Sequence, residues 1–222
     1  MGADMKAVTA PARKMRAAPD TRAKILKAAR EEFSQHGFAG ARTERILSTS
    51  GANPRMLYHH FGGKSGLYVV VLEEALFNLR QQELKIDVDH LNPLEGLIAL
   101  FEHIHRHFDS DLRLVQLLRN ENVEKAKHLK TSQRVREMSS PVLKLIADFL
   151  ARGAQDGSVR TDVDPLHYYV TMVALSQFHL SNAHTLSFIF DQDLTKKDWR
   201  KAHLAFAIEM VKAFLKPVDI PK

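Results

Sequence analysis

The amino-acid sequence predicts an all-α protein with a small basic module at its N-terminus. Apolar residues recur at intervals of three and four along most of the 222 residues, and no alternating stretch of useful length predicts a strand. Residues 1–66 carry 12 Lys and Arg against 5 Asp and Glu, whereas residues 67–222 carry 20 against 21. A basic module joined to a neutral body indicates a polyanionic partner, either nucleic acid or a membrane surface, although a solvated basic face would give the same charge.

The composition limits the class of protein. The chain has no Cys, which excludes disulfides and thiolate metal sites. Residues 1–20 lack the apolar run of a signal peptide, and no apolar stretch is long enough to span a bilayer. No nucleophile–base pair, phosphate-binding loop or paired-acid motif stands out. We therefore expect a cytoplasmic protein that is not an enzyme, needs no cofactor and has no membrane partner.

The first helix is expected to begin at about residue 21. Residues 1–19 combine Ala, Pro and four basic side chains with few large apolar groups, and we expect them to form a disordered basic arm. Asp20 is a good N-cap for the helix that follows. Apolar residues then recur at helical spacing to residue 36, and Gly37 supplies a stop.

Two short helices come next, over about 43–50 and 53–60. Gly51 separates them, and Asn53-Pro54 gives the second one a strong N-cap and a favoured first residue. Two short helices joined by a glycine-containing turn form a helix-turn-helix, in which the second helix enters the major groove of DNA. The sequence therefore predicts a DNA-binding element.

The remainder of the chain is also expected to be helical. A fourth helix should run from Lys64 to about Gln82. We assign the helix-turn-helix DNA-binding domain to residues 20–66 and a helical body to residues 67–222. Further helices are expected over about 93–108, 110–121, 124–154, 164–186 and 197–215, the third of them splitting near Pro141, since proline disfavours a helical residue before it.

The helix-turn-helix region carries a specific residue pattern. It comprises Arg22, Ile25, Leu26, Ala28, Ala29, Phe33, Gly37 and Phe38, followed by Ile46, Gly51, Asn53, the run Leu57-Tyr58-His59-His60-Phe61, Lys64 and Leu67. With this spacing the region resembles the TetR family of bacterial regulators. The resemblance implies a homodimeric repressor that binds a palindromic operator in double-stranded DNA and whose C-terminal body dimerises and binds a small-molecule effector. A dimer is also expected because one helix-turn-helix reads only a few base pairs.

The resemblance implies roles for individual residues. Tyr58 would face a DNA phosphate, and Lys64 would bind one at its helix N-terminus, where the dipole favours an anion. Core packing of Tyr58 and a solvated Lys64 are the structural alternatives. Many family members have Thr-Thr where this chain has Ala41-Arg42. The sequence therefore leaves open which residue caps the second helix, and Arg42 is expected to replace the hydroxyl–phosphate contact with a charged one. Arg55, Met56 and His59 would face base edges. The predicted DNA-binding residues are Arg42, Thr43, Asn53, Arg55, Met56, Tyr58, His59 and Lys64.

The effector site is expected among polar and aromatic residues on otherwise apolar helices. The stretch from Ala174 to His179 is similar to that of regulators of pyrimidine catabolism within the family, which implies a small flat heterocycle. A small organic acid is the other candidate, because Arg106 or Arg119 could bind its carboxylate. The candidate effector-binding residues are His103, His107, Phe108, Tyr168, Gln177, Phe178, His179 and Trp199.

Two further patterns leave alternatives open. His103 and His107 share a helix face at the spacing of two zinc ligands, but His105 points elsewhere and no third ligand is evident, so we predict no metal site. Along the last helix, Leu204, Ile208, Val211 and Leu215 form either a dimer seam or an internal core face.

An alternative function is a DNA-binding regulator without a small effector, controlled by a protein partner or acting architecturally. A fully packed body would favour this alternative, and a cavity would favour a sensor.

Overall fold

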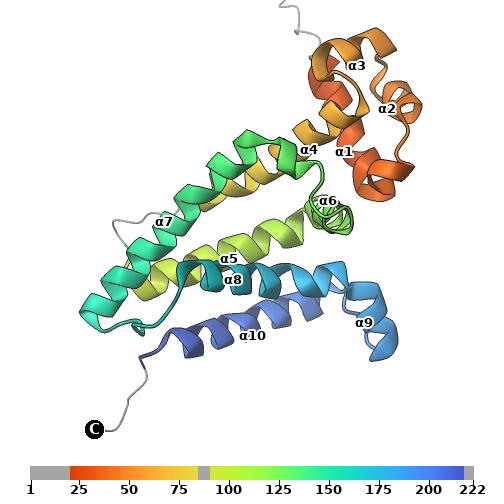
Figure 1. The fold of residues 1–222 in the computed structure, drawn as a ribbon. Helices are drawn as coiled ribbons and strands as arrows, with labels where there is room; N and C mark the ends of the chain where they lie inside the picture. The colour runs from red at the N-terminus through yellow and green to blue at the C-terminus, as the bar shows by residue number, and fades with distance from the viewer. Residues whose placement is uncertain (1–20, 85–90, 218–222) are drawn as a thin grey trace, which may run out of the picture.

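The computed structural model describes residues 21–84 and 91–217. Within these residues the chain forms α-helices and one short 3-10 helix without any strand, which confirms the all-α prediction. Figure 1 shows a small lobe of α1, α2 and α3 at one end and a body of longer helices that run side by side. The predicted basic arm over residues 1–19 and the predicted cap Asp20 lie outside the described residues.

The lobe matches the helices expected from the sequence. α1 spans Thr21–Gly40, α2 spans Thr43–Ser50 and α3 spans Pro54–Phe61. The helical path of α1 breaks at Gly37, where φ is 64° and ψ is −179°, so the regular part of the helix ends where the sequence predicts. Buried side chains from all three helices form the core of the lobe: Ile25, Ala29, Phe33, Ile46, Leu57 and Phe61.

α4 connects the lobe to the body. It spans Lys64–Glu83, starting directly after α3 and packing against α1, α5 and α7. Its Leu67, Val71, Leu72 and Leu79 are buried in one continuous core with the lobe and the body. The proposed domain boundary between residues 66 and 67 therefore falls within the first turn of a continuous helix.

The body is built around α5, which packs against α4, α6, α7, α8 and α10. In Figure 1, α6 is seen end-on between the lobe and the body. The bounds of the body helices are Pro93–Ser110 for α5, Leu112–Val123 for α6, Leu129–Thr131 for the 3-10 helix η1, Gln133–Asp156 for α7, Pro165–Ser181 for α8, Ala183–Ile189 for α9 and Lys197–Leu215 for α10.

Two predictions for residues 124–154 are wrong: that the helix begins at about residue 124, and that it splits near Pro141. Residues 124–132 form turns and η1, because the buried carboxylate of Glu121 accepts hydrogen bonds from the backbone N–H groups of His128 at 2.7 Å and Leu129 at 2.9 Å. α7 then runs through Pro141 without a break. Pro141 is exposed, whereas the neighbouring Val142 and Ile146 are buried, so core packing holds the helix while water can solvate the carbonyl that the proline frees.

Two other expectations need correction. The helix predicted over 164–186 is divided at Asn182, which ends α8 and precedes α9. On α10, Val211 and Leu215 are buried, and Leu204 and Ile208 pack against the same core. Of the two alternatives for these four residues, the structure shows the internal core face.

Candidate nucleic-acid interface

α3 is a short helix with both ends fixed by local hydrogen bonds. The Asn53 side-chain Oδ1 accepts from the backbone N–H of Met56 at 3.0 Å, and Pro54 occupies the first turn. At the other end Gly62 adopts a left-handed conformation and donates its N–H to the Tyr58 carbonyl at 2.9 Å. Asn53 therefore acts as a cap in this structure.

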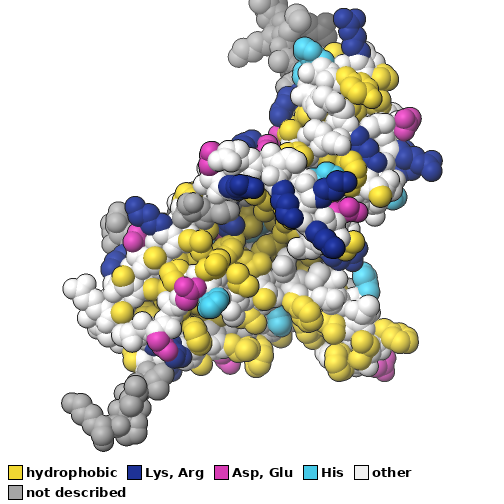
Figure 2. Space-filling model, in the orientation of Figure 1, with side chains coloured by type: hydrophobic (Ala, Val, Ile, Leu, Met, Phe, Trp, Pro, Cys, Tyr) yellow, Lys and Arg dark blue, Asp and Glu magenta, His cyan; other side chains and the backbone are white. Residues whose placement is uncertain are grey.

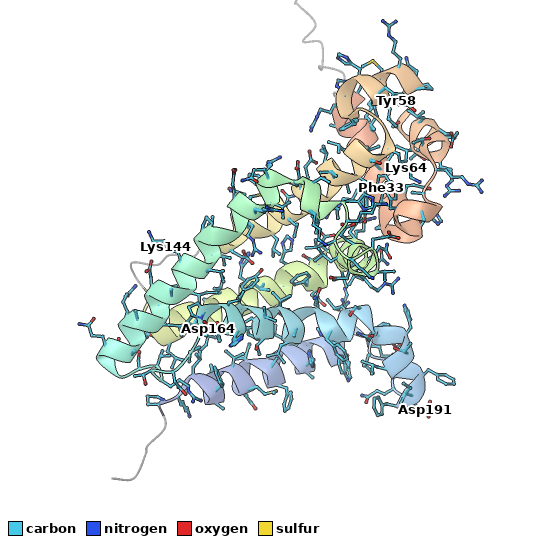
Figure 3. All side chains as sticks on the ribbon, in the orientation of Figure 1. Phe33, Tyr58, Lys64, Lys144, Asp164 and Asp191 are labelled. Atoms are coloured by element: carbon cyan, nitrogen blue, oxygen red, sulfur yellow. The ribbon has the colours of Figure 1, made fainter. Side chains whose placement is uncertain are left out.

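The outward face of α3 carries three of the predicted DNA-binding side chains. Leu57 and Phe61 are buried in the lobe, whereas Arg55, Tyr58 and His59 are exposed. Tyr58 is 67% exposed, which excludes core packing for its side chain, and Figure 3 places it at the far end of the lobe from the body. Met56 differs from these residues because it is half-buried against the lobe core.

The angle between α2 and α3 depends on a glycine turn. Gly51 has φ 66° and ψ 20°, a left-handed conformation that favours glycine, and its N–H bonds to the Leu47 carbonyl. The following N–H, of Ala52, bonds to the same carbonyl at 3.2 Å. The turn thus sets α3 across α2 as a helix-turn-helix requires.

α3 and α4 approach each other closely at their junction. A Cβ atom added to Gly66 would lie 1.9 Å from the carbonyl oxygen of Phe61. Only a residue without a side chain allows the first turn of α4 to approach the end of α3 so closely.

A carboxylate from α1 anchors the start of α2, and sequence reasoning missed it. The residue that caps α2 is Arg42, whose side chain makes no capping bond; Thr43 is the first helical residue. The Glu32 Oε1 atom instead accepts the Arg42 backbone N–H at 2.8 Å and the Arg45 Nε–H at 2.8 Å. Arg45 also reaches the Gly40 carbonyl at 3.0 Å.

The electrostatics of this anchor favour an ionised Glu32. Burial opposes ionisation of the carboxyl, but the hydrogen bonds from Arg45 and from the Arg42 backbone outweigh it, and the pKa of Glu32 is lowered. The side chain of Arg42 itself is exposed beside this anchor, where it is free to meet another charge.

Lys64 begins α4, as predicted, but its ammonium group has a neighbour. The Nζ atom lies 4.8 Å from the centre of the Phe38 ring and the side chain is half-buried. This cation–π contact replaces the freely solvated lysine that was the structural alternative. Figure 3 shows Lys64 on the part of the lobe nearer the body than Tyr58.

Contacts between α1 and α6 join the lobe to the body. Arg30 on α1 pairs with Asp111, which precedes α6, and Glu31 pairs with Arg113. Farther along α6, the Asn120 side-chain amide faces the carbonyls of Phe33 and Ser34 at 3.4 Å each. A change in the position of α6 would therefore act directly on the helix that supports α3.

The predicted effector-binding residues do not gather in one place. His103 and His107 line a hollow of about 410 Å³ between α4 and α5, with Asn78, Arg106 and Ser110. Tyr168 lines another hollow, of about 360 Å³, between α8 and α10. Phe108 is buried in the core, Phe178 is exposed on α8, and Gln177 is half-buried there.

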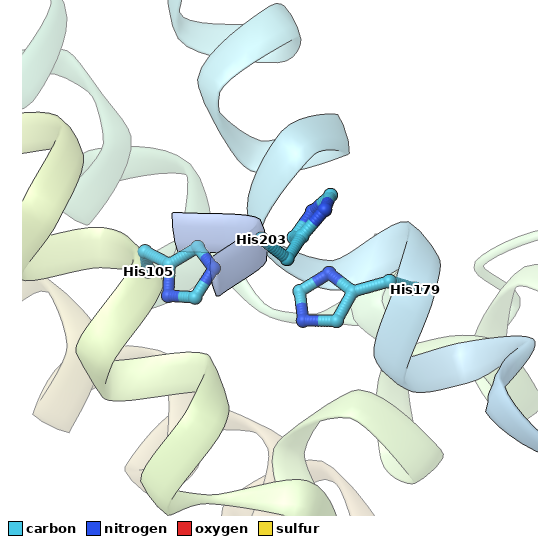
Figure 4. A group of neighbouring side chains, drawn as sticks. All are labelled: His105, His179 and His203. Carbon is cyan, nitrogen blue, oxygen red and sulfur yellow. The ribbon is translucent and has the colours of Figure 1, made fainter. Parts of the chain in front are cut away.

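His179 and Trp199 belong to a third place, a group of aromatic side chains between α5, α8 and α10. The His179 ring lies 5.4 Å from that of His105 and 4.2 Å from that of His203, and Trp199 stacks on His203 (Figure 4). Burial lowers the pKa of His105 to about 4 and that of His179 to about 3, with His203 contributing to both shifts. Both rings are therefore neutral at neutral pH.

A buried ionic group between α4 and α8 was also missed. Arg80 donates to the carboxylate of Glu83 and to the hydroxyl of Tyr169, both at 2.5 Å. Burial raises the pKa of Glu83 although Arg80 opposes the shift, and burial together with Glu83 raises the pKa of Tyr169 to about 12. Arg80 and Glu83 are three residues apart on α4, but Tyr169 is distant in sequence, so no local pattern predicts that it joins them.

Comparisons with known proteins agree with this architecture. A family model for "Bacterial regulatory proteins, tetR family" matches residues 25–71, and one for "Tetracyclin repressor-like, C-terminal domain" matches residues 93–211. The HTH-type transcriptional repressor NicS of Pseudomonas putida is 33% identical over 190 residues, which cover 86% of this chain and 90% of that protein.

Solved structures share the fold at lower sequence identity. The transcriptional regulator SCO4942 of Streptomyces coelicolor superposes with a TM-score of 0.66 at 23% identity, covering 86% of this chain and 97% of that one. The regulator FadR of Bacillus subtilis, solved in complex with stearoyl-CoA, gives a TM-score of 0.61 at 16% identity, covering 87% of this chain and 98% of that one.

The α2–α3 pair and the helical body define a helix-turn-helix DNA-binding regulator rather than an enzyme. The chain belongs to the TetR family of transcriptional regulators, as the resemblance of its N-terminal region predicts, and its relative NicS is a repressor. In the part of the chain that the structure describes, no helix combines the length and apolar character that a membrane crossing needs.

Proposed function

We propose that this protein is a homodimeric repressor that binds a palindromic operator through α3 and is released from it by a small-molecule effector. The observation that carries the proposal is the exposed face of α3, fixed at both ends and directed away from the body. Membership of the TetR family supports repression, DNA binding and dimerisation.

The DNA contacts divide into two kinds. Arg55 and His59 project from the exposed face of α3 and are proposed to read base edges. Tyr58, Arg42 and Thr43 are proposed to contact phosphates, with Asn53 holding the helix as its cap. Lys64, whose ammonium lies over the Phe38 ring, is proposed to contact a phosphate as well, and half-buried Met56 is proposed to touch a base edge only with its tip.

The proposed dimer contact lies on a part of the body with unusual surface chemistry. Large apolar side chains are exposed at intervals of four along α10, and others lie along α8. Figure 2 shows hydrophobic side chains gathered on this side of the body. A contiguous exposed apolar surface of this kind marks an interaction site. Its residues are Leu166, Val170, Phe178, Phe206, Met210 and Phe214, named here the α8–α10 stripe.

The proposed effector is a small organic acid bound in the α4–α5 hollow. Its volume of about 410 Å³ suits a small ligand, Arg106 offers positive charge for a carboxylate, and His103 and His107 offer ring N–H donors. The Arg106 partner Glu102 is held at 3.2 Å within one helix, a weak surface pair that a ligand can displace. The hollow touches α4, the helix that continues into the lobe.

The DNA-binding proposal is tested by selecting bound sequences from a random duplex library and measuring affinities against salt. Arg55→Ala is expected to weaken operator binding and to reduce the preference for the correct base at one operator position by about 1–3 kcal/mol of binding free energy. Lys64→Ala is expected to weaken binding to all sequences and reduce the salt slope by about one. Tyr58→Phe is expected to weaken binding with an unchanged slope, because it removes no charge. Affinities unchanged by all three substitutions would remove α3 as the interface.

The effector proposal is tested separately, by thermal shift with benzoate as an acid and uracil as a heterocycle. Benzoate is expected to raise the melting temperature and, by linkage, to weaken operator binding. Arg106→Ala should abolish the shift, whereas Arg119→Ala, at a different hollow on α6, should retain it. A shift with uracil alone would favour the heterocycle, and a shift lost in Arg119→Ala would move the site to α6.

A further inference from the structure

Three histidine side chains from three helices converge inside the body. His105 comes from α5, His179 from α8 and His203 from α10, and one ring nitrogen of each lies within 4.8 Å of the other two. The ring centres are 5.4 Å apart for His105 and His179, 6.1 Å for His105 and His203, and 4.2 Å for His179 and His203. Figure 4 shows the three side chains next to one another, with the His203 ring seen edge-on.

Two of these rings have unmet hydrogen-bonding capacity. His105 is 2% exposed and His179 is 3% exposed, and within residues 21–84 and 91–217 none of their four ring nitrogens has a hydrogen-bond partner at normal geometry, although the Leu175 carbonyl is near enough to His179 to act against the lowering of its pKa. Buried polar groups are rarely left without a partner, because each one costs about 1–3 kcal/mol. The geometry therefore calls for something between the rings that accepts their lone pairs.

The third ring is oriented as a ligand would be. The Nε2 atom of His203 lies 3.3 Å from the Leu175 carbonyl, so Nε2 carries the hydrogen and Nδ1 keeps its lone pair. A hydrogen bond from the far nitrogen to a backbone carbonyl is the usual support of a metal-bound histidine. The cationic Arg200, close enough to act on His179, is paired with Asp109 at 2.8 Å.

We propose that His105, His179 and His203 bind a first-row transition-metal dication such as Zn²⁺. Three imidazoles suit Zn²⁺, Ni²⁺, Co²⁺ or Cu²⁺ and disfavour Mg²⁺ and Ca²⁺, which prefer oxygen ligands. Zinc–nitrogen bonds of about 2.0–2.1 Å place ligand nitrogens about 3.3 Å apart, so the rings need to close by at most about 1.5 Å. Three protein ligands leave one position for water or a small anion.

The proposal revises the prediction that the chain holds no metal site. That prediction considered His103 and His107, which line the α4–α5 hollow instead. His105 points away from both, as expected, and meets partners on α8 and α10 that local sequence does not reveal. A bound dication would link α5, α8 and α10, and its binding free energy would stabilise the body independently of DNA or effector.

The only Trp of the chain reports on this site. Trp199 stacks on His203 with ring centres 5.1 Å apart and an interplanar angle of 8°. The test uses the full chain without a histidine tag, stripped with a chelator and titrated with Co²⁺ and then Zn²⁺. We expect saturation at one ion per protomer, quenching of Trp199 by Co²⁺, d–d absorption typical of low-coordinate cobalt, and a higher melting temperature with Zn²⁺.

Three variants decide which residues hold the ion. His179→Gln and His203→Gln should each lower affinity by about tenfold or more, whereas His167→Gln, an exposed histidine of the same helix as His179, should not. If His179→Gln fails to fold, the partly exposed His203 still provides the test. Substoichiometric binding, or affinity that His203→Gln leaves unchanged, would overturn the proposal, as would an equal loss in His167→Gln.

Discussion

The carboxylate of Asp111 serves two helices at once. Its Oδ1 accepts the Leu114 backbone N–H at 3.3 Å and so caps α6, while its Oδ2 pairs with Arg30 on α1. The start of a body helix and the support of the DNA-binding lobe are thus held by one side chain. In a TetR-family regulator this residue is well placed to carry movement of α6 into the lobe.

The two roles of Asp111 can be separated by substitution. Asp111→Asn keeps a capping acceptor but removes the charge that pairs with Arg30, and we expect unchanged helix content, faster amide exchange in α1 and a loss of about 1 kcal/mol. Asp111→Ala should lose the cap too and cost about 1 kcal/mol more. Hydrogen exchange and thermal unfolding measure both. Exchange in α1 that Asp111→Asn leaves unchanged would show that the pair does not hold the lobe.

The Glu32 anchor predicts a pH-dependent stability. Because the pKa of Glu32 is lowered in the folded protein, ionised Glu32 contributes stability above the unfolded pKa of about 4.3, and this contribution is lost as the pH falls through the folded pKa. Glu32→Gln should therefore cost about 2 kcal/mol at pH 7, and the difference from the native chain should shrink below about pH 4.3.

Denaturant unfolding across pH measures the Glu32 contribution. Glu44→Gln is the matched control, since Glu44 is an exposed carboxylate on α2 whose charge acts on Arg45 but which takes no part in the hydrogen bonds of Glu32. A pH-independent cost of Glu32→Gln would mean that its ionised form is not what holds Arg45 and the start of α2.

How far the sequence predicts this molecule depends on how local each interaction is. The helix-turn-helix was predictable because Gly51, Asn53 and Gly62 form caps and turns with residues that are close to them in the sequence. The meeting of Glu32 with Arg45 was not, since it depends on the angle between α1 and α2.

The body shows the same limit more strongly. Periodicity predicted that α10 has an apolar face, but could not say whether that face or the exposed Phe206–Met210–Phe214 edge meets another surface. In the sequence, His105, His179 and His203 are isolated histidines, and they come together only because three helices pack against one another. The turn after α6 was not predicted because residues 124–132 contain no glycine or proline that would indicate a turn. The buried carboxylate of Glu121 holds their backbone through hydrogen bonds instead.

The contact at Gly66 predicts a loss of DNA binding without a change in any DNA-facing residue. In Gly66→Ala the new methyl group would lie 1.9 Å from the Phe61 carbonyl oxygen, so α3 must shift relative to α4. We expect a loss of about 1–3 kcal/mol in unfolding free energy and a large fall in operator affinity. Gly40→Ala is the control, because its Cβ would meet only the His36 Cβ at 3.5 Å, an ordinary contact. Full operator affinity in Gly66→Ala would contradict the proposed dependence of α3 on this junction.

The α8–α10 stripe predicts which substitution separates the protomers. Phe206 is 61% exposed and lies at a spacing of four from Met210, which is followed at the same spacing by Phe214, along an exposed edge of α10 beside the buried Val211. Phe206→Glu would bury a charge in the proposed dimer contact, which is costly unless the charge is paired, so we expect a monomer by light scattering with unchanged helix content. Lys212→Glu introduces the same side chain on an exposed part of α10 outside the stripe and should remain dimeric.

Because two half-sites multiply specificity, the monomer formed by Phe206→Glu should also lose most of its operator affinity. A dimer that persists in Phe206→Glu would move the contact elsewhere, with the exposed Phe188 and Phe190 near the end of α9 as the next surface to substitute.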